Sequence, residues 1–163
     1  MKPAVQNVDA LELLAGDHER LNGLFDQFEE SADDRESKLE LFEAIHAELQ
    51  LHTTLEERIF YPALNALKSP RAQEGVKLSL RDHEQIDELL SEIDSLAPEH
   101  PDFDNMMLEL MDSVRSHIKL EQDEIFDVAR AELGGKRLTE LGAQLERLKE
   151  SEKRNIGLVE RDE

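Results

Sequence analysis

Six residues combine imidazole and carboxylate side chains at spacings that suit a metal site: His18, His52, Glu56, His83, His117 and Glu121. In each His-x-x-x-Glu pair the two residues are four positions apart, so in a helix they lie on one face, one turn apart. Imidazole and carboxylate without thiolate favour iron, manganese, zinc or cobalt over calcium or magnesium. Four histidines and two glutamates exceed the needs of one tetrahedral zinc ion. They fit two metal ions bridged by both carboxylates and an oxo or hydroxo group. Iron is the leading candidate, with manganese or zinc as alternatives.

The six residues form an internal repeat. The three in the first half of the chain recur 65 positions later in the second half. Their surroundings recur as well, because Asp17-His18-Glu19 returns as Asp82-His83-Glu84. A repeat of this kind predicts two helical hairpins related by a pseudo-twofold axis. We therefore expect all six side chains at one level of a shared core.

Apolar residues predict the helices that position this set. They recur at alternating spacings of three and four, which predicts helices at 8–30, 34–67, 71–96 and 102–133. The six residues and Ser79 interrupt these apolar seams at positions where a core residue is expected. Burying an unpaired charge is costly, so several such residues, contributed by all four helices, imply a common partner.

The connections between these helices are short, which predicts an all-α, up-down-up-down four-helix bundle. Pro62 lies inside the second helix and is expected to bend or end it. Gly134 and Gly135 are expected to end the fourth. A leucine stripe from 138 to 148 predicts an extra short C-terminal helix, which either docks on the bundle or mediates self-association. We therefore divide the chain into a bundle at 1–134 and a C-terminal helix with a polar tail at 135–163, in a monomer or homodimer.

Composition narrows the classes of function. The chain has 163 residues, enough for one domain with a core. Its 39 acidic residues against 19 basic ones give a formal net charge of -20, which repels nucleic acid and anionic membranes. The sequence lacks cysteine, a long apolar run and the pattern of a secretory signal. We expect a cytoplasmic protein that binds neither nucleic acid nor membranes.

As an ordered set, the motifs resemble the hemerythrin family, specifically bacterial hemerythrin-like proteins with an HHE cation-binding domain. The matching motifs, which fall within residues 8–132, are Asp17-His18-Glu19, His52-Thr-Thr-Leu-Glu56-Glu57 leading into Phe60-Tyr61-Pro62, Asp82-His83-Glu84, and His117-Ile-Lys-Leu-Glu121. The resemblance implies a four-helix bundle with a non-haem di-iron centre. It assigns metal-ligand roles to the six residues, with both glutamates bridging.

Two positions depart from the oxygen-carrying members of that family. Asp87 stands where those proteins have the second histidine of a His-x-x-x-His pair, and Gln122 stands where they have an aspartate. The sequence therefore matches the variant with fewer histidines. For that variant the resemblance implies open metal positions that bind O2, NO or peroxide.

Three further residues are candidates for an extra ligand or a supporting role. Glu124 lies on the predicted seam at the position that Ile59 occupies in the first half, and it is a candidate seventh ligand or proton relay. Glu57 is a rival for that role. Tyr61 is a candidate hydrogen-bond partner of the centre, although packing at the helix end is an alternative.

Three functions follow as hypotheses. The first is a di-iron protein that binds O2, NO or peroxide for sensing, buffering or iron handling. The second is a di-iron enzyme that decomposes hydrogen peroxide or reduces NO. The third is a helical interaction module without metal, in which the charge serves solubility.

Overall fold

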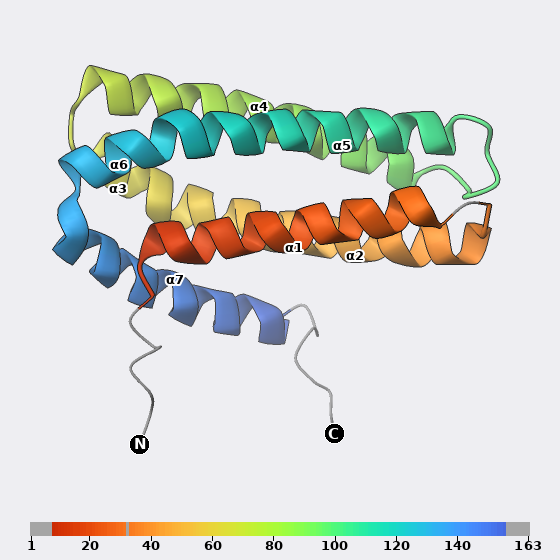
Figure 1. The fold of residues 1–163 in the computed structure, drawn as a ribbon, viewed down its shortest axis with the longest axis horizontal. Helices are drawn as coiled ribbons and strands as arrows, with labels where there is room; N and C mark the ends of the chain where they lie inside the picture. Colours follow the sequence, from red (N-terminus) through yellow and green to blue (C-terminus); the bar gives the residue numbers. More distant parts are fainter. Residues whose placement is uncertain (1–7, 32, 156–163) are drawn as a thin grey trace.

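Helices make up nearly all of the structure, a computed structural model that describes residues 8–31 and 33–155. Four long helices run side by side and alternate in direction (Figure 1). They are α1 (Ala10–Glu30), α2 (Arg35–Leu55), α4 (Pro70–Asp94) and α5 (Phe103–Leu120). This arrangement confirms the predicted four-helix bundle.

Local sequence signals explain where the long helices begin. At α1, Asp9 accepts a hydrogen bond from the backbone N–H of Glu12, and the Glu12 side chain accepts one from the N–H of Asp9. The side chain of Asp34 caps α2, and Ser69 caps α4, whose first residue is Pro70. These caps satisfy backbone N–H groups that have no partner within the helix.

Two of the long helices pass through one widened turn into a short helix. The turn η2 (Glu56–Phe60) leads from α2 into α3 (Tyr61–Asn65), and η3 (Glu121–Ile125) leads from α5 into α6 (Phe126–Glu132). In these π-helical turns a backbone N–H bonds to the carbonyl five residues back instead of four. Tyr61 bonds in this way to Glu56, and Phe126 to Glu121. Each turn therefore contains one residue more than an α-helical turn would need.

The extra residue changes which side chains face the core. The sequence predicts Ile59 and Glu124 on the seams, and both predictions are wrong by one position. Phe60 and Ile125 are buried there instead, while Glu124 is exposed and Ile59 is only partly buried. The α-helical period of 3.6 residues, on which the prediction rests, does not hold across a π turn.

Pro62 is the second residue after η2 and does not end the helix, which continues to Asn65. Asp127 occupies the equivalent position after η3, and that turn is equally wide. A proline is therefore not required for the widened turn. The interruption predicted near Pro62 is present, but it is a change of helical register that starts at Glu56.

The core consists of two apolar clusters with a polar layer between them. One cluster, with Leu14 and Phe60, fills the end of the bundle that contains α3, α6 and the last helix. The other, with Phe25 and Phe103, fills the end that contains the α1–α2 and α4–α5 connections. Buried histidines and glutamates occupy the helix positions between these clusters. Apolar packing thus shields the polar layer from both ends.

The last helix, α7 (Gly134–Asn155), is longer than the predicted stripe and lies along the outside of α1 and α2 (Figure 1). Leu138 and Leu145 are buried in the apolar cluster at that end. A Cβ added at Gly142 would lie 2.3 Å from the carbonyl oxygen of Val8, so α7 approaches the start of α1 closely there. The stripe therefore docks on the bundle, which was one of its two expected roles.

The predicted domain boundary after residue 134 falls at the start of α7, where Gly134 has a positive φ of 82°. That region of backbone conformation is readily available only to glycine. Residues 156–163, the end of the predicted polar tail, lie outside the described residues. No helix among the described residues is long and apolar enough to cross a membrane.

Candidate metal centre

The structure brings all six predicted residues together in the polar layer. Even the most exposed of them, His117, is only 4% exposed. Their nitrogen and oxygen atoms form two groups in which all the atoms lie within 4.8 Å of one another. The first group is His18, His52, Glu56 and Glu121, and the second is Glu56, His83 and His117. The two groups share Glu56.

Each glutamate reaches both pairs of histidines with different oxygens. In Glu56, Oε2 lies 3.0 Å from Nε2 of His52, while Oε1 lies 3.0 Å from Nε2 of His83. In Glu121, Oε1 lies 3.1 Å from Nε2 of His18, while Oε2 lies 3.7 Å from Nε2 of His117. Such an arrangement suits two cations, one beside each histidine pair, with both carboxylates between them.

Two atoms of the centre are buried without a hydrogen-bond partner. They are Nε2 of His52 and Oε2 of Glu56, which face each other but make no hydrogen bond of acceptable geometry. Leaving buried polar atoms unpaired is costly, and a metal ion would satisfy both through their lone pairs. Oγ of Ser79, one helical turn before His83 on α4, is likewise buried and unpartnered. The donor set therefore fits a bound cation.

A second layer of side chains orients all four imidazole rings. Every Nδ1 lies against a side-chain oxygen of another helix, which leaves Nε2 directed at the centre. The pairs are His18 with Gln122 at 2.7 Å, His52 with Asp17 at 2.8 Å, His83 with Glu57 at 2.6 Å and His117 with Asp82 at 3.0 Å. Histidine ligands of metals are commonly held in this way, through the nitrogen that does not bind the metal.

The sequence names Glu57 as a candidate for an extra ligand or a supporting role, but it assigns no role in the centre to Gln122. The internal repeat, if applied to Glu57, would have identified Gln122. Gln122 stands 65 residues after Glu57. It contacts His18 as Glu57 contacts His83, since the two histidines are related by the same spacing.

Tyr61 lies in the centre rather than only packing at a helix end. Its hydroxyl lies 3.0 Å from Oε1 of Glu56, donates a hydrogen bond to Oε2 of Glu121, and lies 3.4 Å from Nε2 of His83. Burial, together with the negative charges of Glu56 and Glu121, raises the pKa of Tyr61 well above its usual value. The phenol therefore keeps its proton at neutral pH.

Glu124 does not face the centre. Its side chain is exposed and lines a small, mainly apolar surface cavity of about 160 Å³ with Leu64, Gly75 and Ile125. The widened turn η3 places Ile125, not Glu124, against the core. The seam position on which the ligand and proton-relay hypotheses for Glu124 depend is therefore wrong.

In the absence of metal, protons balance the charges of the centre. Burial lowers the pKa of His117, but hydrogen bonds to Asp82 and Glu56 outweigh it and raise the pKa to about 10. The pKa of Glu56 is held well below its usual range, because the charge of His52 and hydrogen bonds from its neighbours outweigh burial. Burial and then the charge of Glu56 raise the pKa of Glu121. Of the two carboxylates, Glu121 is therefore the one that binds a proton more readily.

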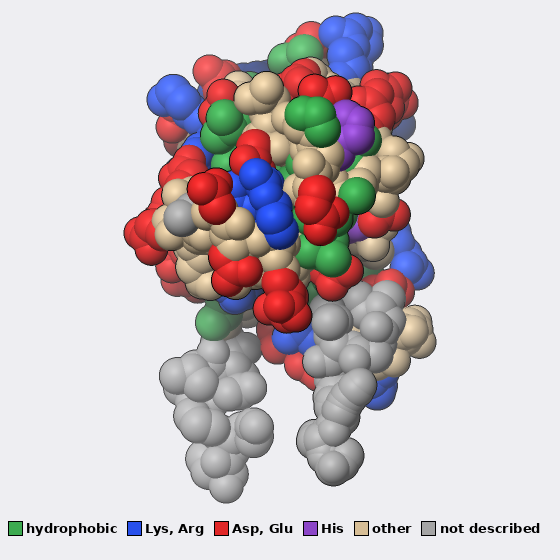
Figure 2. All heavy atoms as spheres, turned by 90° about the vertical axis from the view of Figure 1, so that its right-hand side faces the viewer, with side chains coloured by type: hydrophobic (Ala, Val, Ile, Leu, Met, Phe, Trp, Pro, Cys, Tyr) green, Lys and Arg blue, Asp and Glu red, His purple; other side chains and the backbone are tan. Residues whose placement is uncertain are grey.

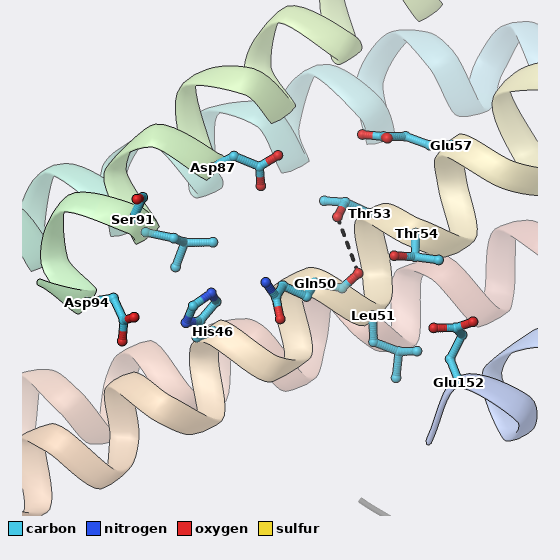
Figure 3. A pocket seen from close by; sticks show the side chains of 11 residues that line it. His46, Gln50, Leu51, Thr53, Thr54, Glu57, Asp87, Ser91, Asp94 and Glu152 are labelled. Carbon is cyan, nitrogen blue, oxygen red and sulfur yellow. Dashed lines mark hydrogen bonds between the residues drawn. The ribbon is translucent and has the colours of Figure 1, made fainter. Parts of the chain in front are cut away.

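Beside the centre, an open groove of about 560 Å³ lies between α2 and α4 (Figure 3). Glu57 and Asp87 line it from facing helices, together with His46 and Asp94. Burial, and then the charge of Glu57, raises the pKa of Asp87. Asp87 thus faces the groove and belongs to neither group of metal-binding atoms, as expected for a chain that lacks a histidine at this position.

Comparisons with known proteins agree with this geometry. A curated protein to which this chain is similar is a DNA nickase from Nostoc sp., 24% identical over 153 residues. The match covers 93% of this chain and 42% of the nickase, so this chain spans less than half of that protein. A solved structure, that of a Hemerythrin HHE cation binding domain-containing protein from Mycobacterium kansasii, superposes with a TM-score of 0.80 at 22% identity. That superposition covers 91% of this chain and 89% of the other.

The sequence profile of the Hemerythrin HHE cation binding domain matches residues 9–129. This segment contains the four bundle helices, both widened turns and every residue of the buried cluster. The cluster is a set of ligands suited to a metal cation. The chain belongs to the hemerythrin HHE cation-binding family.

Proposed function

We propose that this chain binds two iron ions in a centre of four histidines and two glutamates, and that the centre takes up O2, NO or peroxide. The observation that carries the proposal is the position of the two carboxylates. Each glutamate has one oxygen beside the His18/His52 pair and the other beside the His83/His117 pair. A site for a single cation does not require both carboxylates to span two pairs of imidazoles.

The chain's own residues prepare the centre for this role. The Nδ1 contacts hold the imidazoles in one orientation, and the apolar clusters above and below exclude water. Tyr61 holds a proton on its hydroxyl between the two carboxylates. When bound, iron supplies open coordination positions for a small ligand and the capacity for one-electron redox chemistry. We expect the chain to sense or buffer that ligand, or to handle iron.

Iron quantitation with an optical spectrum tests the proposal. The metal-free protein is reconstituted anaerobically with ferrous iron, freed of excess iron and then exposed to air. We expect about two irons per chain and absorption bands of the oxo-to-iron type, because the ligand set suits a non-haem pair. Fewer than about 1.5 irons per chain, without such bands, contradicts the di-iron proposal.

A second candidate, turnover of peroxide, is favoured by one observation. The buried hydroxyl of Tyr61 places a proton donor within hydrogen-bond distance of both carboxylates. The iron-loaded protein should then decompose peroxide faster than an equal amount of free iron. Tyr61→Phe should reduce that rate while iron content stays at about two per chain. A rate equal to that of free iron rules out this candidate.

We do not extend the nicking activity named for the Nostoc protein to this chain. The formal net charge of -20 repels the phosphate backbone of DNA. The aligned region is also less than half of that protein.

A further inference from the structure

We propose that the two metal positions are unequal, and that the position beside His83 and His117 binds its metal more tightly than the position beside His18 and His52. The inference rests on the di-iron function proposed above. The pseudo-twofold repeat makes the two positions nearly equivalent in their direct ligands. The side chains behind the imidazoles break that equivalence.

The first difference lies behind His18 and His83. Nδ1 of His83 faces the carboxylate of Glu57, whereas Nδ1 of His18 faces the amide oxygen of Gln122. A carboxylate is ionised at neutral pH, while an amide carries no charge. The same place in the repeat is therefore anionic on one side and neutral on the other.

The second difference lies behind His52 and His117. Asp17, behind His52, is fully buried, and its Oδ1 accepts a hydrogen bond from Nζ of Lys149 at 2.8 Å and another from Arg20. Asp82, behind His117, has no lysine or arginine partner among residues 8–31 and 33–155, and its side chain is 37% exposed. Cations therefore compensate the carboxylate behind His52, one of them supplied by α7.

The aromatic neighbours of His18 and His83 also differ. The ring of Phe126 stacks on His18 with centroids 5.9 Å apart. At the equivalent place in the other half, the ring of Tyr61 lies 5.5 Å from that of His83, and its hydroxyl is directed at the carboxylates. One position therefore has an apolar neighbour and the other a polar one.

The differences behind Nδ1 of the four imidazoles all act in one direction. An anionic acceptor at Nδ1 increases the basicity of Nε2 and strengthens its bond to a cation, whereas a neutral or compensated acceptor does so less. Two uncompensated carboxylates support His83 and His117. An amide and a carboxylate already paired with two cations support His18 and His52. The tighter position is therefore the one beside His83 and His117.

The test is an anaerobic titration of the metal-free chain with ferrous iron, in equilibrium competition with a chromophoric chelator, which yields two stepwise binding constants. In Gln122→Glu we expect the second, weaker constant to rise by about tenfold, because support of a ligand by its neighbours is typically worth ten- to a hundredfold in affinity. In Glu57→Gln we expect the first, tighter constant to fall by a similar factor. Both substitutions keep the shape of the side chain.

Glu124→Gln is the matched control, because it removes a charge from the same turn as Gln122, whereas it is Gln122 that contacts Nδ1 of an imidazole. It should change neither constant. If Gln122→Glu raises the first constant instead of the second, or if Glu57→Gln lowers only the second, the inference is wrong and the di-iron proposal stands. If the natural sequence binds fewer than about 1.5 irons, the di-iron proposal itself fails.

Discussion

Glu56 is the residue common to both groups of metal-binding atoms. Its two oxygens face opposite pairs of histidines, so loss of the carboxylate's negative charge affects both positions. Glu56→Gln should reduce iron content from about two per chain to well below one, because a neutral amide replaces a shared anionic ligand. Glu124→Gln should retain both irons. Loss of one iron alone from Glu56→Gln would argue that this glutamate binds a single metal.

The histidines predict an unusual pH dependence for the metal-free chain. The folded-state pKa of His117 is about 10, and those of His52 and His83 are also raised above the usual value of 6.5. A raised pKa means that the folded state binds protons more tightly than the unfolded chain. The resulting stability is complete below about pH 6.5 and is lost as pH rises toward 10.

Thermal denaturation across that range checks the prediction. The melting temperature of the metal-free chain should fall as pH rises from about 6.5 to 10. With iron bound the imidazoles carry metal instead of protons, so this fall should be absent. A metal-free chain whose melting temperature rises steadily over the same range would refute the assignment of raised pKa values.

At the scale of single residues, the sequence predicts the six direct ligand candidates but not all of the side chains that contact them. The six direct ligand candidates were recognisable because polar residues interrupt apolar seams and recur 65 positions later. Gln122 was not recognisable in this way, because an amide on a helix face has no distinctive chemistry until its contact with His18 is known. Lys149 was not recognisable either, because the two residues of its hydrogen bond to Asp17 lie 132 positions apart in the sequence.

At the scale of the helices, the number, order and approximate bounds follow from the apolar pattern and the caps. The widened turns do not, because a π turn has no characteristic composition and changes only the register that follows it. This explains why Ile59 and Glu124 are both misplaced by one residue, at positions related by the repeat. The error is confined to side chains that follow Glu56 and Glu121.

The helix α7 depends on one glycine for its close contact with α1. A Cβ at position 142 would meet the backbone of Val8 and Asp9, which cannot move aside as a flexible side chain can. Gly142→Ala should lower the free energy of unfolding by about 1–3 kcal/mol, through overpacking. Gly135→Ala, at a position on the same helix with open space around it, should be neutral or slightly stabilising. Equal melting temperatures for the two variants in thermal denaturation would contradict the close approach.

At the scale of the whole molecule, the metal is expected to contribute to stability. The centre buries two glutamates and four histidines between two apolar clusters, and cations are their natural partners. Removing iron should lower the melting temperature by several degrees at least, since the free energy of metal binding adds to that of folding. Calorimetry of the iron-loaded and metal-free chains measures this directly. Coincident transitions would show that the bundle does not depend on its metal.

The net charge of -20 has little to do with the centre itself. Acidic side chains cover much of the end of the bundle at the α1–α2 and α4–α5 connections (Figure 2). Among residues 8–31 and 33–155, Glu56 and Glu121 are the only acidic members of the candidate ligand groups. The remaining charge keeps the molecule soluble and attracts cations diffusely, which salt will screen.

The two widened turns belong to the internal repeat. They begin at Glu56 and Glu121, each contains one residue more than an α-helical turn, and they lie 65 positions apart, as the paired histidines do. The repeated unit therefore includes the change of helical register as well as the candidate ligand at which that change begins. Glu57 and Gln122 occupy the same place within this unit, so the two halves share a backbone path there and differ in the charge that faces the imidazole.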